Sequence, residues 1–231
     1  RMSGEHKLKE NDEITMTVET TNSVELLFFT NKCQVYKSRA CEFDDTKASV
    51  LGDFVGSKLQ MEEGETAISM AVVKEYKGYM LFFFQNGKVA KVEMNQYSTK
   101  TNRKKLINAY SDKSPLVSAM YIREETDIVI ENINGRKLLI NTKVINAKTT
   151  KNTQGVSIMK LRKGHKVVDA HVFVEGELDN PARYRGRTLP SSGKLSEEDA
   201  EHLHFKGAAL IAHLHPLVES HPSVVIHMDG D

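Results

Sequence analysis

The chain has 231 residues, a formal net charge of +1, 39% hydrophobic residues and only 5 prolines, a composition typical of a folded globular protein. No run of 18 apolar residues is present, which argues against a membrane-spanning helix, and the start at Arg1-Met2-Ser3-Gly4 has no signal-peptide pattern. A start on Arg suggests a piece of a longer polypeptide. The two cysteines, Cys33 and Cys41, indicate reduced thiols rather than a disulfide or a metal site.

Charge is distributed very unevenly along the chain. Residues 1–87 carry 10 Lys+Arg against 14 Asp+Glu, residues 88–166 carry 17 against 6, and residues 167–231 carry 5 against 11. The near-neutral total is therefore a cancellation between two acidic blocks and a basic block of +11. A basic block of this density favours a polyanionic partner, because each neutralised phosphate releases condensed counterions. An ordinary solvated surface is the alternative explanation.

Strand signals recur along the chain at a period near fifty residues. Similar β-rich segments are anchored at Ile14, Ile68, Val117 and Val168, with spacings of 54, 49 and 51. Between these anchors the sequence predicts three hairpins: Val24–Thr30 with Cys33–Arg39, Tyr79–Gln85 with Lys88–Met94, and Asp127–Ile133 with Arg136–Thr142. This period, with about four short strands in each repeat, predicts β-sheet blades arranged radially, roughly three of them in this chain.

The expected hairpin turns are Asn31-Lys32, Asn86-Gly87 and Asn134-Gly135. Asn-Gly is a strong turn signal because both residues tolerate the positive φ angles of a type I′ turn. The first turn has Lys where the others have Gly, so we expect it to be looser. The phenylalanines of the strands are expected to be core residues rather than stacking platforms for bases, and they are Phe28, Phe29, Phe82, Phe83 and Phe84.

Two segments carry a family resemblance. The run Lys151-Asn152-Thr153-Gln154-Gly155-Val156, followed by an aliphatic strand, resembles the last blade of the C-terminal domain of bacterial DNA gyrase A subunits. Lys47–Asp53, followed by Leu59–Glu65, looks like a loop of the A subunits of gyrase or topoisomerase IV. Together with the Asn-Gly-Lys hairpin, these segments span roughly residues 10–175.

The resemblance implies an all-β fold, a β-pinwheel or propeller-like domain at 1–174, followed by a short mixed or disordered tail at 175–231 that is acidic and His-rich. It implies a type IIA DNA topoisomerase A subunit whose rim wraps double-stranded DNA without reading its sequence. The partners would be the ATPase B subunit, together with the rest of the A subunit, in a cytoplasmic, nucleoid-associated bacterial enzyme with no membrane contact. ATP and Mg would be used elsewhere in that enzyme, so this chain alone needs no cofactor or metal and is not itself an enzyme.

The family's strand-cleaving Tyr, which follows an Arg, belongs to a domain not present here. Arg183-Tyr184 imitates that pair, but its position in the acidic tail argues against a nucleophile. The glycine-rich basic box that distinguishes gyrase from topoisomerase IV does not occur in the sequence, and in the family it lies in an earlier blade. The sequence therefore does not decide between the two enzymes.

The candidate DNA contacts are the cations on hairpins and loops of the basic block. Arg103-Lys104-Lys105 is the densest cluster, and we expect it to lie in a loop that follows the phosphate backbone, while acidic residues should weaken binding by the first repeat. The full set is Lys88, Lys91, Lys100, Arg103, Lys104, Lys105, Arg136, Lys137, Lys143, Lys148, Lys151, Lys160, Arg162 and Lys163.

The C-terminal segment loses the repeat pattern after residue 174. Ser196-Glu197-Glu198-Asp199 resembles a helix-capping box, and Ala200–His215 is a candidate short helix. Histidines are frequent beyond residue 200, but residues two apart on a helix point in different directions, which argues against a metal site. The acidic tail is a candidate competitor for the DNA surface. The alternative function for the whole chain is a propeller-type protein-interaction module with a basic face.

Overall fold

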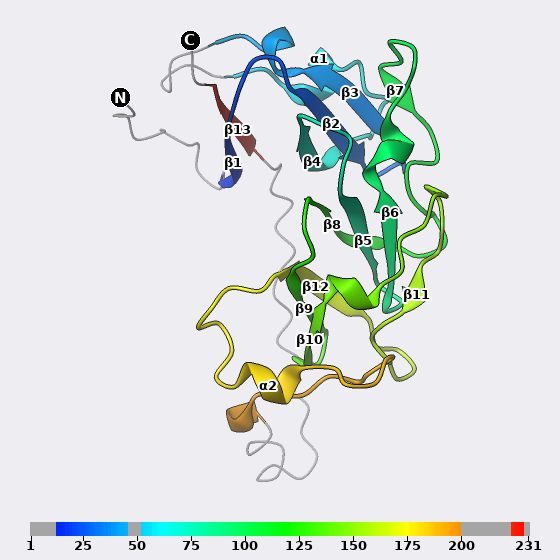
Figure 1. Ribbon diagram of the computed structural model, residues 1–231, viewed down its shortest axis with the longest axis vertical. Coiled ribbons are helices and arrows are strands. Elements are labelled where there is room, and N and C mark those ends of the chain that lie inside the picture. Colours follow the sequence, from blue (N-terminus) through cyan, green and yellow to red (C-terminus); the bar gives the residue numbers. More distant parts are fainter. Residues whose placement is uncertain (1–12, 46–51, 200–222, 229–231) are drawn as a thin grey trace. The chain divides into compact units, whose positions relative to one another are not determined.

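The computed structural model describes residues 13–45, 52–199 and 223–228, and these residues form mostly antiparallel sheets (Figure 1). They divide into two compact units. Unit 1 comprises the described residues of 1–75, 102–106 and 212–231, and unit 2 those of 76–101 and 107–211.

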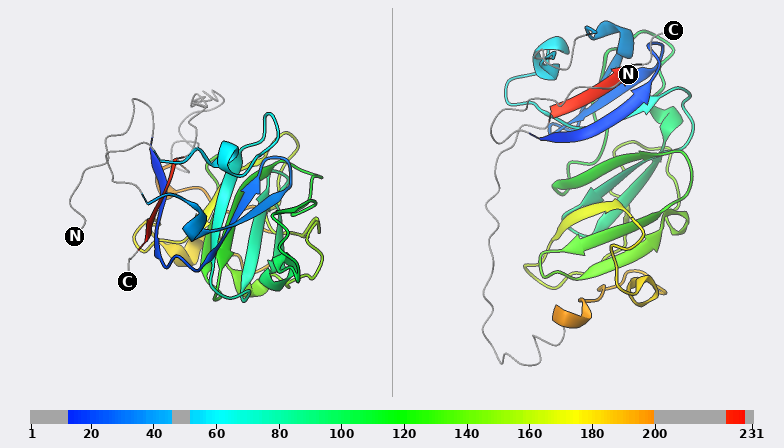
Figure 2. Two further views of the ribbon diagram at one scale, coloured as in Figure 1. Left: turned by 90° about the horizontal axis from the view of Figure 1, so that it is seen from above. Right: turned by 90° about the vertical axis from the view of Figure 1, so that its left-hand side faces the viewer.

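Unit 1 contains a four-stranded sheet, sheet 1, in the order β4-β2-β3-β7. Its strands are β2 (Glu25–Thr30), β3 (Val35–Arg39), β4 (Ala67–Val73) and β7 (Lys105–Leu106). A 3-10 turn, η1 (Ala40–Glu42), and a single helical turn, α1 (Val55–Lys58), lie between β3 and β4. The unit also contains β1 (Ile14–Thr20), which pairs in parallel with β13 (Ser223–Met228), the blue and red strands of Figure 2.

Unit 2 contains two sheets. Sheet 2 has the order β11-β6-β5-β8, with β5 (Tyr79–Phe84), β6 (Lys88–Glu93), β8 (Leu116–Ile122) and β11 (Val156–Ser157). Sheet 3 has the order β10-β9-β12, with β9 (Asp127–Asn132), β10 (Lys137–Asn141) and β12 (Val167–Val172). The short helical segments are η2 (Met94–Tyr97), η3 (Thr142–Val144) and α2 (Pro181–Tyr184).

All three sheets follow the plan that the repeat predicts. In each, a hairpin is followed by a strand that returns to pair with the first strand of that hairpin, and a register shift interrupts this second pairing. The same backbone hydrogen bond closes each turn, from Cys33 N to Thr30 O (3.2 Å), Gly87 N to Phe84 O (3.0 Å) and Gly135 N to Asn132 O (2.9 Å). The predicted repeat of hairpins is therefore confirmed.

The first hairpin turn was placed one residue too early by the sequence pattern. The residue equivalent to Gly87 and Gly135 is Cys33, and all three have positive φ angles, of 56° for Cys33, 79° for Gly87 and 72° for Gly135. Asn86 and Asn134 do not have positive φ angles, so the expected type I′ geometry is wrong. The true equivalent of the two turn asparagines is thus Lys32, not Asn31. Since a side chain at positive φ is disfavoured, the first turn keeps this geometry at an energetic cost that glycine avoids in the other two.

The outermost strand of sheets 1 and 2 comes from the next repeat, which the sequence pattern did not reveal. β7 pairs with β3, and β11 pairs with β6, although each follows a later hairpin in the sequence. Both strands have only two residues, too few for an alternating pattern to be visible.

Sheet 3 is completed by residues that the sequence placed in the tail. Lys194 pairs with Lys137 through two backbone hydrogen bonds of 2.8 Å, as Val156 pairs with Val89 in sheet 2. The residue before each of these strand positions is a glycine, Gly155 or Gly193, whose N–H lies 3.3 Å from the hydroxyl oxygen two residues earlier.

The two glycines also approach the neighbouring strand in the same way. An added Cβ would lie 2.2 Å from the carbonyl oxygen of Val89 for Gly155, and 2.7 Å from that of Lys137 for Gly193. Ser191-Ser192-Gly193-Lys194 is therefore a structural repeat of Thr153-Gln154-Gly155-Val156. The boundary expected at residue 174 does not end sheet 3, and Leu178 and Tyr184 also pack on it.

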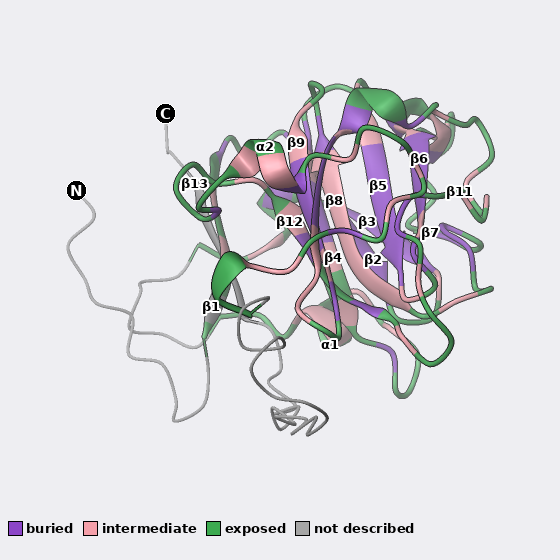
Figure 3. Cartoon of the chain, turned by 90° about the horizontal axis from the view of Figure 1, so that it is seen from below, coloured by how far each residue is buried: buried purple, intermediate pink, exposed green. Residues whose placement is uncertain are grey.

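The core lies within the sheets, where the hairpin strands are buried (Figure 3). The five phenylalanines expected in the core are each no more than 2% exposed, as predicted. Buried and exposed residues do not alternate along the central hairpin strands β2 and β5 as they would along a half-exposed strand, because both faces of these strands are covered.

The remaining predictions concern the cysteines, membrane spans and the capping box near residue 196. Neither Cys33 nor Cys41 forms a disulfide bond within the described residues, and no described helix is long and apolar enough to cross a membrane. The hydroxyl of Ser196 accepts a hydrogen bond from the Asp199 N–H (3.0 Å), which confirms the predicted cap. The candidate helix at Ala200–His215 and its histidines lie outside the described residues.

Candidate nucleic-acid interface

The outer edge of sheet 2 and the loop that follows it carry a cluster of cations. Residues 148–156 run along β6, because the backbone of Lys148 bonds with Lys91 and Glu93, and Val156 pairs with Val89. The chain then passes the hairpin turn, where the carbonyl of Gly87 accepts hydrogen bonds from two successive amides. We call residues 148–166 the basic edge, and its cations are Lys148, Lys151, Lys160, Arg162, Lys163 and Lys166.

The basic edge has no nearby negative charge in the sequence to neutralise it. Residues 132–166 contain nine Lys+Arg and no Asp or Glu. Within the described part of the chain, no cation of the basic edge forms an ion pair, and all but the half-buried Lys151 are exposed. Unpaired, solvated cations on a strand edge held by backbone hydrogen bonds are suited to contacting successive phosphates.

Gly155 fixes the position of this edge. It has a φ of 74°, and its Cα lies so close to β6 that no side chain fits there. The hydroxyl of Thr153 accepts a hydrogen bond from the Gly155 N–H, which closes the turn just before β11. The Thr-Gln-Gly-Val run that carries the family resemblance is therefore the segment that attaches the basic edge to sheet 2.

Lys91 is not available to DNA, contrary to its place in the candidate set. Its side chain is 3% exposed, and its ammonium lies 2.5 Å from a Glu125 carboxylate oxygen and 3.2 Å from the carbonyl of Thr142. It also lies 4.2 Å from the centre of the Tyr79 ring. Partial burial raises the pKa of Glu125, but hydrogen bonds from Lys91 and Thr142 outweigh it and leave that pKa below its usual value. Lys91 thus joins sheet 2 to the loops at the ends of sheet 3.

Replacing Lys91 by Met is expected to destabilise the protein by about 2 kcal/mol, since Glu125 and the Thr142 carbonyl each lose the hydrogen bond that the Lys91 ammonium donates. We place this loss below that of a fully buried pair because Glu125 is 34% exposed. Urea denaturation of K91M, E125Q and the double variant measures the coupling between the two residues. The double variant should be more stable than K91M. A K91M protein as stable as the wild type would contradict this role.

The cluster at residues 103–105 does not form the free loop that we expected. Lys105 belongs to β7, and the carbonyl of Lys104 accepts a hydrogen bond from the Lys37 N–H (2.8 Å). The two lysines are also paired, Lys104 with Glu42 at 3.7 Å and Lys105 with Glu62 at 2.5 Å. Only Arg103 in this cluster is exposed without an ion pair within the described chain.

The remaining candidates lie at several places. Lys100 and Lys143 are exposed, whereas Lys88 is half-buried with its ammonium 3.4 Å from Gln154. Arg136 donates a hydrogen bond to the carbonyl of Gly193 (3.0 Å), and Lys137 lies 3.9 Å from Glu131. Both are therefore engaged within sheet 3.

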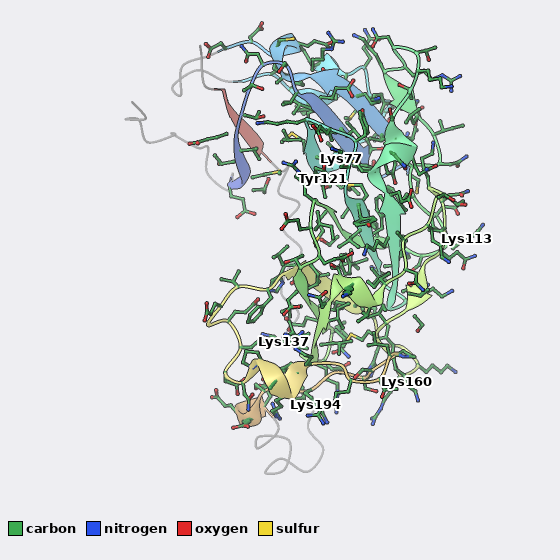
Figure 4. The ribbon with its side chains drawn as sticks, viewed as in Figure 1. Lys77, Lys113, Tyr121, Lys137, Lys160 and Lys194 are labelled. Atoms are coloured by element: carbon green, nitrogen blue, oxygen red, sulfur yellow. The ribbon has the colours of Figure 1, made fainter. Side chains whose placement is uncertain are left out.

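The exposed cations of unit 2 outside the candidate set include Lys166, Arg187 and Lys194. In the sequence, Lys166 lies three residues after Lys163, the last of the candidate DNA contacts. Arg187 and Lys194 belong to the segment that completes sheet 3, and the Ser-x-Gly run at residues 191–193 was the available signal. Figure 4 shows Lys160 and Lys194 at one end of unit 2, away from Lys77 and Tyr121 at the other.

The described residues include no cluster of metal-ligating side chains. Tyr184 is 3% exposed, and burial and a hydrogen bond with Asp179 raise its pKa. The Arg183 guanidinium lies over its ring, 5.4 Å from the centre. Tyr184 packs on sheet 3 against Val129 and Leu139.

Comparison with known proteins points to one family. A family model described as the DNA gyrase C-terminal domain, beta-propeller, matches residues 147–173, which include the whole basic edge. The DNA gyrase A subunit of Borrelia hermsii (strain HS1 / DAH) is 25% identical over 175 residues, covering 75% of this chain and 22% of the relative. The DNA gyrase A subunit of Streptomyces coelicolor is 26% identical over 190 residues, covering 74% and 21%. The chain thus spans about a fifth of the length of these relatives.

Solved structures share the fold. The C-terminal domain of DNA topoisomerase IV has a TM-score of 0.58 at 22% identity, over 66% of this chain and 48% of that chain. The C-terminal domain of E. coli ParC has a TM-score of 0.57 at 13% identity, over 76% and 78%. In its family match, its relatives and its fold, this chain is similar to the C-terminal β-pinwheel domains of type IIA DNA topoisomerase A subunits.

Proposed function

We propose that this chain binds double-stranded DNA through phosphate contacts along the basic edge and bends the duplex around it. The unpaired cations of the basic edge carry this proposal, because they lie on the outer edge of sheet 2 and on the loop that follows it, both held by backbone hydrogen bonds. Smoothly bending 20–30 base pairs by 40–90° costs on the order of 1–6 kcal/mol, which several Lys or Arg contacts to phosphate can offset.

The binding would be independent of base sequence. The described chain has no helix long enough to enter a major groove, and its core phenylalanines are not available to stack on bases. Phosphate contacts alone position a duplex without reading it.

In the parent enzyme, this domain would support ATP-dependent changes of DNA topology. The rest of the A subunit would supply the strand-cleaving Tyr, and the B subunit would supply the ATPase, with ATP and Mg used there. Such an enzyme would act on the nucleoid in the bacterial cytoplasm. The present chain would contribute DNA binding and no chemical step.

DNA binding and wrapping have separate tests. Fluorescence anisotropy with duplexes of about 25 and about 150 base pairs, at several salt concentrations, is expected to give tighter binding per site to the longer DNA and a steep loss of affinity with salt. Ligating nicked circular DNA in the presence of the protein should change its linking number. Salt-dependent binding with no length preference and no linking change would reject wrapping, and no DNA binding would favour a protein-interaction module.

A further inference from the structure

The loop before β4 in sheet 1 is built like the loop before β12 in sheet 3, but with opposite charge. Backbone hydrogen bonds join Asn31 N to Thr66 O (3.1 Å) and, equivalently, Ile133 N to Lys166 O (2.9 Å). The glycines at the third loop position have φ angles of 70° and 80°. By this correspondence, Glu62 and Glu63 occupy the positions that Arg162 and Lys163 hold in the basic edge.

The Glu62 carboxylate accepts hydrogen bonds from three side chains. Its oxygens lie 2.5 Å from the Lys105 ammonium, 3.4 Å from the Gln34 amide nitrogen and 3.5 Å from the Lys32 ammonium. The hydrogen bond from Lys105 is the main reason that the pKa of Glu62 falls to about 2, so the carboxylate is ionised at neutral pH. We call Lys32, Gln34 and Lys105 the anion cradle.

The anion cradle is held in place by groups other than the Glu62 carboxylate. Glu65 is 6% exposed and accepts hydrogen bonds from the Thr30 hydroxyl (2.5 Å), the Tyr36 hydroxyl (2.8 Å) and the Glu62 N–H (3.0 Å). Lys32 also donates to the carbonyl of Glu63 at 2.7 Å. Lys105 is part of β7 and lies 5.5 Å from the centre of the Tyr36 ring. Lys32 and Lys105 would therefore keep these contacts if the carboxylate moved away.

The cradle is also accessible. The side chains of Glu62, Lys32 and Lys105 are 49%, 38% and 36% exposed, so an anion from solution can reach the two ammonium groups. Carboxylate and phosphate oxygens accept the same charge-assisted hydrogen bonds from lysine. An exposed Glu side chain needs only rotations about its own single bonds to release them.

We propose that the anion cradle is a DNA phosphate site of unit 1, occupied in the free protein by the Glu62 carboxylate as an internal substitute for phosphate. This inference rests on the proposed function, since the incoming anion is a phosphate of bound duplex DNA. Displacement of Glu62 would leave a free carboxylate near the DNA, so unit 1 binds more weakly than its lysine content suggests. The sequence expectation of weak binding by the first repeat thus gains a specific cause.

Glu62→Gln tests the cradle, with Glu63→Gln as the matched control. Both substitutions remove one exposed negative charge from the same loop, but only Glu62 contacts the cradle through its side chain in the described structure. In salt titrations, E62Q should bind duplex DNA roughly three- to tenfold tighter than the wild type. Its log affinity should also fall more steeply with log salt concentration, by the amount that about one to two additional phosphate contacts contribute. E63Q should stay near the wild type, and E62Q/K105Q should lose most of the gain.

The outcomes separate the two proposals. Salt-dependent binding by the wild type together with equal behaviour of E62Q and E63Q would overturn the cradle and leave the proposed function intact. A wild-type protein that does not bind DNA would instead reject the proposed function itself. Circular dichroism and urea denaturation of each variant show whether the fold is kept.

Discussion

Reversing Arg162 and Lys163 to Glu is expected to weaken binding to duplex DNA by roughly ten- to a hundredfold at about 0.1 M salt. The slope of log affinity against log salt concentration should also become shallower, by the amount that about two phosphate contacts contribute. Both side chains are exposed, and both lie in the part of the basic edge that has no neighbouring carboxylate in the sequence. Each reversal removes a phosphate contact and adds a repulsive charge. Anisotropy titrations at several salt concentrations measure both effects.

The matched control is the reversal of Lys77 and Arg123, two exposed cations of the same unit. They lie at the other end of sheet 2, because Lys77 precedes β5 and Arg123 follows β8. The net charge changes by the same amount in both double variants. The control should lose no more than about threefold in affinity. An equal loss in the two double variants would mean that binding depends on overall charge and not on the basic edge.

Gly155→Ala is expected to destabilise the protein by about 3 kcal/mol. The backbone φ of 74° disfavours any side chain, and the new Cβ would lie 2.2 Å from the Val89 carbonyl oxygen, so β11 must move away from β6. Urea denaturation measures the loss of stability. Because β11 anchors the basic edge, DNA affinity should fall as well, although no charge is removed.

Gly164→Ala is the control that separates backbone strain from the clash. Gly164 has a φ of 80°, but an added Cβ there meets nothing within 4 Å. G164A should therefore cost only about 1 kcal/mol, the penalty of positive φ for a residue with a side chain. Equal destabilisation of G155A and G164A would show that β11 is not held tightly against β6.

The hairpins and their period were determined by the sequence itself. A hairpin is a local structure, and Asn86-Gly87 and Asn134-Gly135 signal its turn within two residues. Runs such as Tyr79–Phe84 are apolar enough to predict a buried strand from composition alone. The charge of the basic edge is equally visible, because it is a count of residue types along the chain. The first turn was misplaced by one residue because Cys33 occupies a position where a glycine was the expected signal.

Only the tertiary structure decided which strands complete the sheets and which cations are free. The two-residue strands β7 and β11 exist through pairing with distant segments, and residues 191–194 complete sheet 3 without any regular alternation of their own. Lys91 and Lys148 look alike in sequence, yet one is buried on Glu125 and the other is exposed. Burial and ion pairing depend on neighbours far away in the chain, so local residue patterns carry no record of them.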